Sequence, residues 1–345
     1  MSRWLSLVLI ALLFTACSEE HALPTAPGST QIQAATTSAA VGTGNPAALG
    51  DKVQHVPRDY ATIRAALDAA GEGGVIQVSA GIYNENVVVT TSGLRLHASQ
   101  GVVINGAGTG IGIHVLGTSA RPVTDVEISG FEVRGFERGI VAELGVGIQI
   151  HRNDIHDIRN LGSLTAGDGE GVMLWTTRDS EVSENVVHQN SYTGIALRGG
   201  STNNTIRANR VYENGNPAVA PTGMSNRGTG ILITGEGTNG NRIVENEILR
   251  NYDRGILITR PAGTTPISGN VVAQNRIHES QRSGIAVMLA AAGNFILQND
   301  ARENNLSGLA PCYQCNLNDL SSAGIGGNTW ERNLGTFNLR DDCMR

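Results

Sequence analysis

Two short sequence units alternate along the middle of the chain, and their spacing restricts the fold more than any other feature. One is Gly-apolar-x-apolar, as at Gly194, and the other is Asn-x-[Val/Ile]-x-x-[Asn/Ser], as from Asn185 to Asn190. A complete turn takes about 23 to 25 residues wherever no insertion intervenes. Each unit has the length and period of a strand that is not stable alone, so successive copies must stack. The Gly units begin at Gly139, Gly171, Gly194, Gly230, Gly255 and Gly284, and the Asn units at Asn153, Asn185, Asn209, Asn246 and Asn275, with a degenerate copy at Asn299.

Stacked copies of such strands predict a parallel β-helix, an all-β solenoid with its core inside the coils. Alternate positions of the Gly units, such as Ile195, Leu197 and Ile231, should point inward and form columns. The Asn residues should lie at bends, where they tolerate left-handed backbone and hydrogen-bond to the next coil. The alternative fold is a leucine-rich repeat, but the leucine spacing that this fold requires is absent.

The composition suits a chain of many turns and excludes some functions. Of 345 residues, 44 are Gly and 29 are Asn, and both types are poor helix formers. The formal net charge is −6 and aromatic residues make up 4%, so we expect no nucleic-acid partner, which would need a basic face or stacking platforms. Lys52 is the only lysine, and this removes lysine as a catalytic base within the coils.

Residues 1–17 have the pattern of a lipoprotein-type signal peptide. A short basic start precedes an apolar run over residues 4–14, which is too short to cross a bilayer. Residues 13–17 resemble a bacterial lipobox, and the resemblance implies lipidation of Cys17, which would then become the mature N-terminus. Ordinary secretion without a lipid is the alternative.

Residues 18–50 are rich in Ala, Thr, Ser, Gly and Pro and show no apolar period, as in a flexible tether. We therefore expect a folded body on the bacterial outer membrane or cell surface, with membrane contact only through the lipid. Without lipidation the protein would be periplasmic or secreted.

The start of the folded body contains two recognisable motifs. A helix is predicted over residues 59–70, which include the pattern Thr-Ile-x-x-Ala-x-x-Ala, and residues 80–87 read Ala-Gly-Ile-Tyr-Asn-Glu-Asn-Val. These motifs resemble those of the pectate-lyase-like and pectin-methylesterase-like β-helix superfamily, and the later coils resemble the repeats of NosD-like and carbohydrate-active proteins. The resemblance implies a right-handed β-helix over residues 51–310, with the helix covering its open end.

Residues 311–345 are expected to form an irregular C-terminal cap that a disulfide holds in place. An oxidising compartment favours one bond from Cys343 to either Cys312 or Cys315, and Cys315 with Cys343 is the pair that we carry forward. Cys312 and Cys315 also have the spacing of a redox or zinc pair, but no second pair of ligands accompanies them.

Two insertions interrupt the repeat at the same corner of the predicted solenoid. Four residues usually separate the end of an Asn unit from the next Gly, but in two copies the separation is 13 and 16. We expect residues 159–169 and 215–229 to form two walls of a groove whose floor includes Tyr192, since long loops on a regular scaffold often carry function. The alternative is that the two insertions are tolerated by the fold and have no function.

The fourth position of the Asn unit places ring side chains in one outward column. His156, His188 and Tyr212 should stack about 4.8 Å apart beside this groove. With Arg198 on the neighbouring strand, they are our candidates for proton transfer and carboxylate binding. The alternative is that these residues belong to an ordinary polar surface without a catalytic role. We assign substrate binding to Asp157, Glu170, Trp175, Tyr192, Glu213 and Arg227.

These residues lead to two functional hypotheses. The first is a monomeric, surface-tethered protein that binds or processes an extracytoplasmic, acidic polysaccharide in a lateral groove. As an enzyme it would be a polysaccharide lyase or a uronate epimerase. The second is a non-catalytic β-helix protein with a role in adhesion or envelope structure. Copper handling, as in NosD-like proteins, has little support because His and Met do not cluster with each other as copper ligands should.

One motif and one metal bear on the enzyme hypothesis. Residues 154–157 read Asp-Ile-His-Asp, which is similar to the Asp-Pro-His-Asp motif of mannuronan C5-epimerases, although Ile155 replaces Pro. The similarity implies proton transfer at the uronate C5 atom. No cofactor is certain, but Ca²⁺ would assist an elimination with Arg198 as the base. The candidate ligands are Asp154, Asp157, Asp168 and Glu170.

Overall fold

Each turn of the chain contributes one short strand to each of three parallel sheets. In one coil, β16 (Glu181–Ser183), β17 (Val186–His188) and β18 (Ile195–Arg198) follow one another and pair in register with the equivalent strands of the next coil. Neighbouring coils thus satisfy each other's backbone groups, which explains how strands this short are stable. The computed structural model describes residues 53–159, 169–215, 228–260, 266–306, 316–321 and 327–339.

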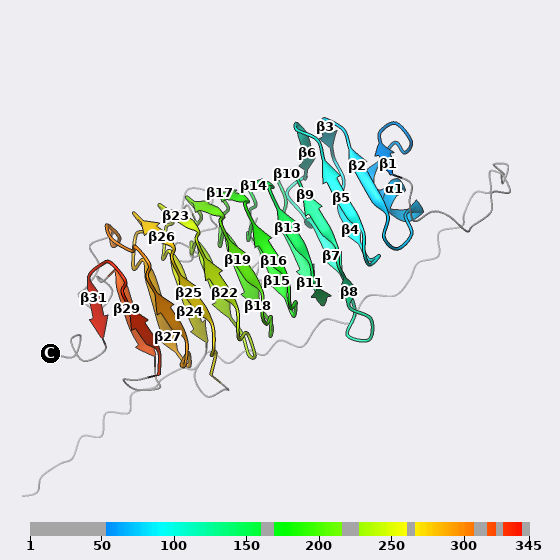
Figure 1. Cartoon of the computed structure of the whole chain (residues 1–345). Helices are drawn as coiled ribbons and strands as arrows, with labels where there is room; N and C mark the ends of the chain where they lie inside the picture. The colour runs from blue at the N-terminus through cyan, green and yellow to red at the C-terminus, as the bar shows by residue number, and fades with distance from the viewer. Residues whose placement is uncertain are drawn as a thin grey trace, which may run out of the picture. The chain divides into compact units, whose positions relative to one another are not determined.

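The three sheets run along the stack of coils, and Figure 1 shows their strands in chain order from blue to red. Sheet A consists of β1 (Gln54–Val56), β2 (Val75–Val78), β5 (Arg95–Ala98), β9 (Glu127–Ser129), β13 (Gln149–His151), β16, β19 (Thr205–Arg207), β22 (Arg242–Val244), β25 (Val271–Ala273), β28 (Phe295–Leu297) and β30 (Thr329–Glu331). Sheet B consists of β3 (Gly81–Tyr83), β6 (Val102–Asn105), β10 (Glu132–Arg134), β14 (Asp154–His156), β17, β20 (Arg210–Tyr212), β23 (Glu247–Leu249) and β26 (Arg276–His278). Sheet C consists of β4 (Val87–Val89), β7 (Ile111–Leu116), β11 (Arg138–Glu143), β15 (Val172–Trp175), β18, β21 (Ile231–Thr234), β24 (Ile256–Arg260), β27 (Ile285–Leu289), β29 (Leu317–Ser321) and β31 (Phe337–Leu339). A small separate pair joins β8 (Val123–Thr124) to β12 (Gly145–Val146).

Aliphatic side chains fill the inside of the coils in columns, as the repeat predicted. Ile195, Leu197 and Ile231 are fully buried, as are their counterparts Ile256 and Ile258 two coils further on. The inward columns of all three sheets belong to one continuous cluster of buried apolar residues. Burial of this apolar surface is the main free-energy gain of folding.

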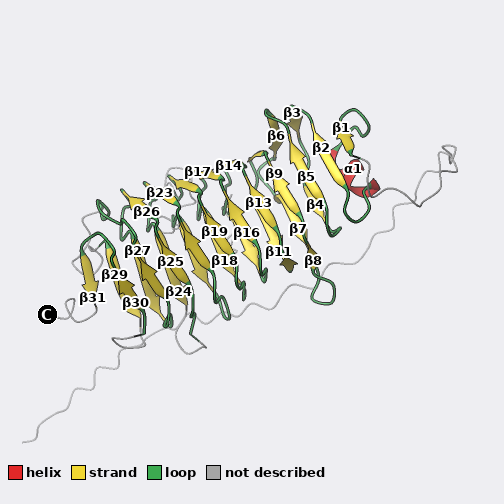
Figure 2. Cartoon of the chain, in the orientation of Figure 1, coloured by secondary structure: helices red, strands yellow, loops and turns green. Residues whose placement is uncertain are grey.

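The helix α1 (Ile63–Ala69) lies at the N-terminal end of the stack, and the described chain is otherwise built from strands and turns, as Figure 2 shows. It turns its buried face towards β1, β2 and β4. Thr62 caps it, and the carboxylate of Glu85 accepts hydrogen bonds of 3.0 Å from the N–H groups of both Ile63 and Arg64. A carboxylate is favourable at a helix N-terminus. Glu85 therefore joins the two motifs that carry the family resemblance.

Asparagine side chains form ladders at the bends between sheets. From Asn185 to Asn209 and on to Asn246, each Oδ1 accepts from the backbone N–H and the side-chain N–H of the residue one coil before, at 3.0 Å. This confirms that the Asn units bond between coils. A further ladder, which the sequence units did not reveal, lies at the turn that leads from sheet C to sheet A. It consists of Asn204, Asn241, Asn270 and Asn294.

The left-handed residue at these bends is not the asparagine, as the sequence had led us to expect. The residue before it has positive φ, as at Glu184 (56°), Gln189 (52°) and Glu213 (56°). The asparagine itself keeps an ordinary backbone because its buried side chain must reach the next coil. The preceding side chain points outward, so many residue types are tolerated there.

The described parts of the predicted C-terminal cap continue the sheets. β29 and β31 extend sheet C, and β30 extends sheet A, so the coils continue to residue 339, beyond the expected end at residue 310. The disulfide expected between Cys315 and Cys343 lies outside the described residues, as do Cys17 and the tether. Within the part of the chain that the structure describes, no helix has the length and apolar character needed to cross a membrane.

Candidate functional site

The predicted column of rings exists on the outward face of sheet B. His156 and His188 stack with ring centroids 4.9 Å apart, and His188 and Tyr212 stack at 4.7 Å with parallel ring planes. Their strands β14, β17 and β20 pair in register, so that equivalent positions lie directly above one another. The repeat alignment was therefore sufficient to predict this stack.

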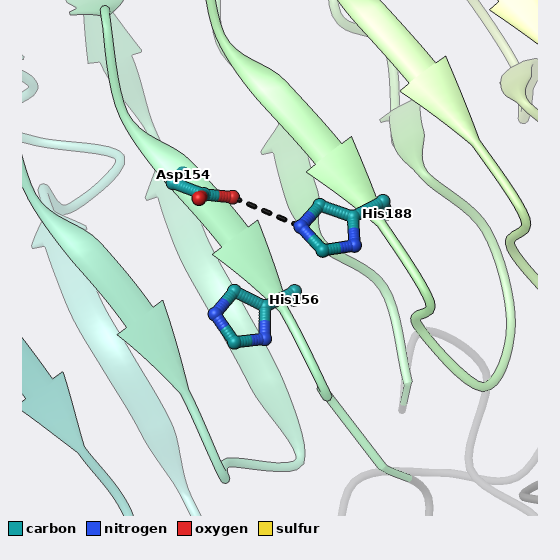
Figure 3. Close-up of side chains that lie close together, drawn as sticks. All are labelled: Asp154, His156 and His188. Atoms are coloured by element: carbon teal, nitrogen blue, oxygen red, sulfur yellow. Dashed lines mark hydrogen bonds and ion pairs between the residues drawn. The ribbon is translucent and has the colours of Figure 1, made fainter.

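Carboxylates of the same face bind the edges of these rings. His156 Nδ1 lies 2.9 Å from Asp157 and its Nε2 lies 3.3 Å from Glu132, while His188 Nε2 lies 3.1 Å from Asp154. Figure 3 shows the side chains of Asp154, His156 and His188 together. His188 Nδ1 is buried and has no hydrogen-bond partner.

Tyr212 lies at the end of this column, next to His188, and is not activated as a base. Burial raises its pKa, and the nearby cation of Arg210, 5.0 Å from the ring centroid, opposes that effect only in part. Tyr212 therefore keeps its proton at neutral pH. Glu213, one of the predicted substrate-binding residues, accepts hydrogen bonds from Arg250 at 3.0 Å and from Gln189 at 3.3 Å.

A second group of predicted residues lies on the outward face of sheet C. Arg198 Nε donates to Glu170 Oε1 at 2.9 Å, and both side chains are buried. Burial alone would lower the pKa of Arg198, but pairing with Glu170 and the nearby Tyr192 outweigh it and raise the pKa. Arg198 thus stays protonated, which suits the binding of an anion and not the abstraction of a proton. Trp175, in register with Arg198, is 38% exposed.

The structure does not bring these two groups together as the repeat alignment predicted. His156, His188, Tyr212, Asp157 and Glu213 follow sheet B, whereas the other group follows sheet C, and no hydrogen bond or ion pair among the described residues joins them. The groove walls lie largely outside the described residues, as does Arg227. The turn between sheets B and C separates outward side chains that the linear alignment placed side by side.

A pocket with a volume of about 320 Å³ opens on the outward face of sheet C, and we call it the sheet C pocket. Its apolar floor is formed by Leu232, Leu257 and Met288, and its rim by threonines and charged side chains. Its volume is at the small end of the range for small-molecule sites. The lining residues are Tyr192, Thr193, Arg198, Thr229, Leu232, Thr234, Asp253, Arg254, Leu257, Thr259 and Met288.

Four side chains just before the repeat glycines are almost completely buried and have a polar atom without a hydrogen-bond partner. These atoms are Glu170 Oε2, Thr193 Oγ1, Arg254 Nε and Ser283 Oγ. An unpaired buried polar group costs about 1 to 3 kcal/mol, so a protein usually satisfies each one. Thr193 and Arg254 line the sheet C pocket, and Glu170 pairs with Arg198, a third residue that lines it.

Thr193, Asp253 and Arg254 were not among the residues predicted from the sequence, although a signal was present. The residues just before the six repeat glycines are Arg138, Glu170, Thr193, Thr229, Arg254 and Ser283, so three of these positions are charged and three carry a hydroxyl group. Charge at such a buried position is costly without a purpose.

The pocket contains a buried ion pair and a positive surplus. Arg254 binds Asp253 at 2.7 Å and Arg282 lies 3.4 Å from the same carboxylate. Burial raises the pKa of Asp253, although both arginines favour its charged form. With Arg198 and Glu170, three arginines face two carboxylates on this part of sheet C.

The arrangement argues against glycosidase chemistry and against the expected Ca²⁺ site. Glu170 and Asp253 lie about three coils apart, or roughly 14 Å, whereas a hydrolytic pair needs about 5 to 9.5 Å. Of the Ca²⁺ ligands expected from the sequence, Glu170 binds Arg198 on sheet C while Asp154 and Asp157 bind histidines on sheet B. These described carboxylates do not form the oxygen cage that Ca²⁺ needs, and Asp168 lies outside the described residues.

Comparison with known proteins establishes the family. Residues 80–272 match the family model described as a right handed beta helix region. The chain belongs to the right-handed β-helix family. This confirms the handedness and the fold that the sequence motifs implied for the β-helix.

Solved structures of other β-helices agree with this fold. The Dettilon tailspike protein has a TM-score of 0.57 at 15% identity, over 81% of this chain and 62% of its own. The A-module of Azotobacter vinelandii mannuronan C-5 epimerase AlgE4 has a TM-score of 0.52 at 19% identity, over 84% and 93% of the two chains. DFA-IIIase from Arthrobacter chlorophenolicus A6 has 0.54 at 14%, over 82% and 86%.

At these identities the likeness establishes the fold alone. The β-helix spans 62% of the length of the tailspike chain that it matches. Among curated proteins, none matches the sequence significantly. The function must therefore be argued from the site.

Proposed function

We propose that this protein binds an acidic polysaccharide outside the cytoplasm, with one sugar residue held in the sheet C pocket. The observation that carries the proposal is the set of unpartnered buried atoms of Thr193, Arg254 and Glu170 on one face. Sugars offer hydroxyl groups that both donate and accept hydrogen bonds, so successive sugar residues of one polysaccharide can satisfy a hydroxyl, a guanidinium N–H and a carboxylate oxygen in different coils.

The remaining features of the pocket fit an acidic sugar. The guanidinium groups of Arg198 and Arg254 suit the planar carboxylate of a uronate. Leu232 and Leu257 offer an apolar floor for the C–H face of the ring. The exposed Trp175 extends this surface beyond Arg198, and an indole can pack against a further sugar ring.

The fold supports a polysaccharide ligand without identifying it. Mannuronan C-5 epimerase, which is named for a polysaccharide, shares the β-helix architecture. None of the described residues that line the sheet C pocket is a histidine. The acid–base roles that we predicted for His156, His188 and Tyr212 would therefore need a separate site on sheet B, so the proposal is binding without catalysis.

Thr193→Val tests this proposal directly. Valine keeps the shape of threonine and removes a hydroxyl that has no partner, so we expect unchanged or slightly raised stability. Binding to the cognate polymer should weaken about tenfold, because one ligand hydrogen bond is worth about 1 to 1.5 kcal/mol. Calorimetric titration with oligosaccharides of alginate, pectate and glycosaminoglycans measures the affinity, and thermal unfolding measures the stability.

The matched control is Thr205→Val on sheet A, which is outside the pocket and should leave the affinity unchanged. Ultraviolet absorbance of unsaturated products and proton NMR of each polymer test for elimination and epimerisation. Equal affinity of wild type and Thr193→Val for a polymer that binds would place the polymer elsewhere. The absence of binding to every polymer would favour the adhesion or envelope-structural alternative.

The lipid anchor gives a separate prediction. If Cys17 is lipidated, the wild-type protein should incorporate a labelled fatty acid, whereas Cys17→Ser should lose more than about 90% of the label, because no thiol remains to carry the acyl chain. Metabolic fatty-acid labelling measures this. Cys343→Ser is the control and should keep the label, while equal labelling of wild type and Cys17→Ser would contradict the anchor.

A further inference from the structure

We propose that Asp154, His156 and His188 form a binding site for one divalent late first-row transition-metal ion that joins β14 to β17. One oxygen of the carboxylate and one nitrogen of each imidazole all lie within 4.8 Å of one another. For three atoms no further apart than this, some point lies within about 2.8 Å of all of them. Side-chain shifts of under about 1 Å would therefore reach the bond lengths of zinc, about 2.0 to 2.2 Å.

The donor atoms already have the partners that metal ligands usually have. His188 Nε2 and Asp154 Oδ1 are 3.1 Å apart, a separation that two ligands of one ion commonly show at such bond lengths. His156 Nδ1 lies 2.9 Å from Asp157, and a carboxylate on the second ring nitrogen is the usual outer partner of a ligating histidine. That bond leaves His156 Nε2 as the donor, with Glu132 3.3 Å away as a further oxygen ligand.

The donor set selects the kind of ion. Two imidazoles and a carboxylate suit Zn²⁺, Co²⁺, Ni²⁺ or Cu²⁺, whereas Ca²⁺ takes oxygen ligands. Figure 3 shows the two rings beside each other. Their planes differ by only 16°, so one ring must rotate about its Cβ–Cγ bond to direct its lone pair at the ion. Asp154 is exposed, which leaves one side open for water to complete the coordination.

Metal titration of the intact chain, stripped of metal and free of any histidine tag, tests this inference without any polysaccharide. Calorimetry with ZnCl₂ should show one site per chain that Asp154→Asn and His188→Gln each weaken by at least about 100-fold. Asp157→Asn should weaken it by about tenfold, as expected for loss of an outer partner. Saturating Zn²⁺ should raise the unfolding temperature of the wild type by several degrees, because the ion binds the folded state and bridges two coils.

His151→Gln is the matched control, since His151 also pairs with a carboxylate, Glu127 at 2.9 Å, but lies on sheet A outside the cluster. It should bind Zn²⁺ as the wild type does. Visible absorption of the Co²⁺-loaded protein should report nitrogen and oxygen ligands, and it should disappear in His188→Gln. Zn²⁺ affinity that Asp154→Asn and His188→Gln leave unchanged, or no saturable binding to the wild type, would overturn the inference.

Discussion

Gly255→Ala is expected to lower the free energy of unfolding by about 3 kcal/mol or more. A Cβ atom on Gly255 would lie 2.2 Å from Ile277 Cγ2 and 2.6 Å from the carbonyl oxygen of Gly284 in the next coil. Neither neighbour can withdraw easily, because the Ile277 side chain is part of the core and the carbonyl belongs to paired backbone. The coils would have to separate locally, which breaks sheet C.

The matched control is Gly71→Ala. Gly71 has no atom within 4 Å of the added carbon, and its φ is not in the left-handed region. This substitution should change stability by less than about 0.5 kcal/mol. Chemical denaturation followed by circular dichroism compares the two variants. Similar stability of Gly255→Ala and wild type would show that the coils tolerate a wider spacing than the structure indicates.

Asn209→Ala is expected to lower the free energy of unfolding by roughly 3 to 5 kcal/mol. Asn209 Oδ1 accepts from the backbone N–H and the side-chain N–H of Asn185, and its Nδ2 donates to Val182, Arg207 and Asn246. Alanine leaves several of these buried groups without a partner and without access to water. The cost should therefore be that of several unsatisfied groups and not that of one lost hydrogen bond.

Asn84→Ala serves as the comparison. Asn84 is exposed and its side chain accepts one hydrogen bond, from Asn105 at 2.8 Å, so water can replace that contact. We expect a loss of less than about 1 kcal/mol. Hydrogen exchange should show the effect of Asn209→Ala concentrated in the neighbouring coils, because a solenoid couples mainly nearest neighbours. An Asn209→Ala variant as stable as Asn84→Ala would mean that the ladder is dispensable.

The ring column was predictable because it depends only on repeat register. In a parallel β-helix, equivalent positions of successive coils lie above one another, so His156, His188 and Tyr212 had to stack once the Asn units were aligned. The same alignment could not show that Arg198 and Glu170 belong to a different face. That depends on the turn between sheets B and C, whose direction the residues of the repeat do not encode.

The sheet C pocket was not predictable for a related reason. Thr193 and Arg254 are 61 residues apart in the chain, from 193 to 254, and only the stacking of coils places them at one pocket. Their missing hydrogen bonds are a property of the packed structure. The sequence signal, a charged residue just before some of the repeat glycines, indicated an unusual position but not its neighbours.

The sequence alone determined the β-helix, its inward columns and its bonded Asn bends, because each follows from a repeat that must stack to be stable. Tertiary structure decided which outward residues share a face. Inward positions are fixed by the burial of apolar surface, which any strand of period two obeys. Outward positions are free of that constraint, so their grouping depends on how each corner turns.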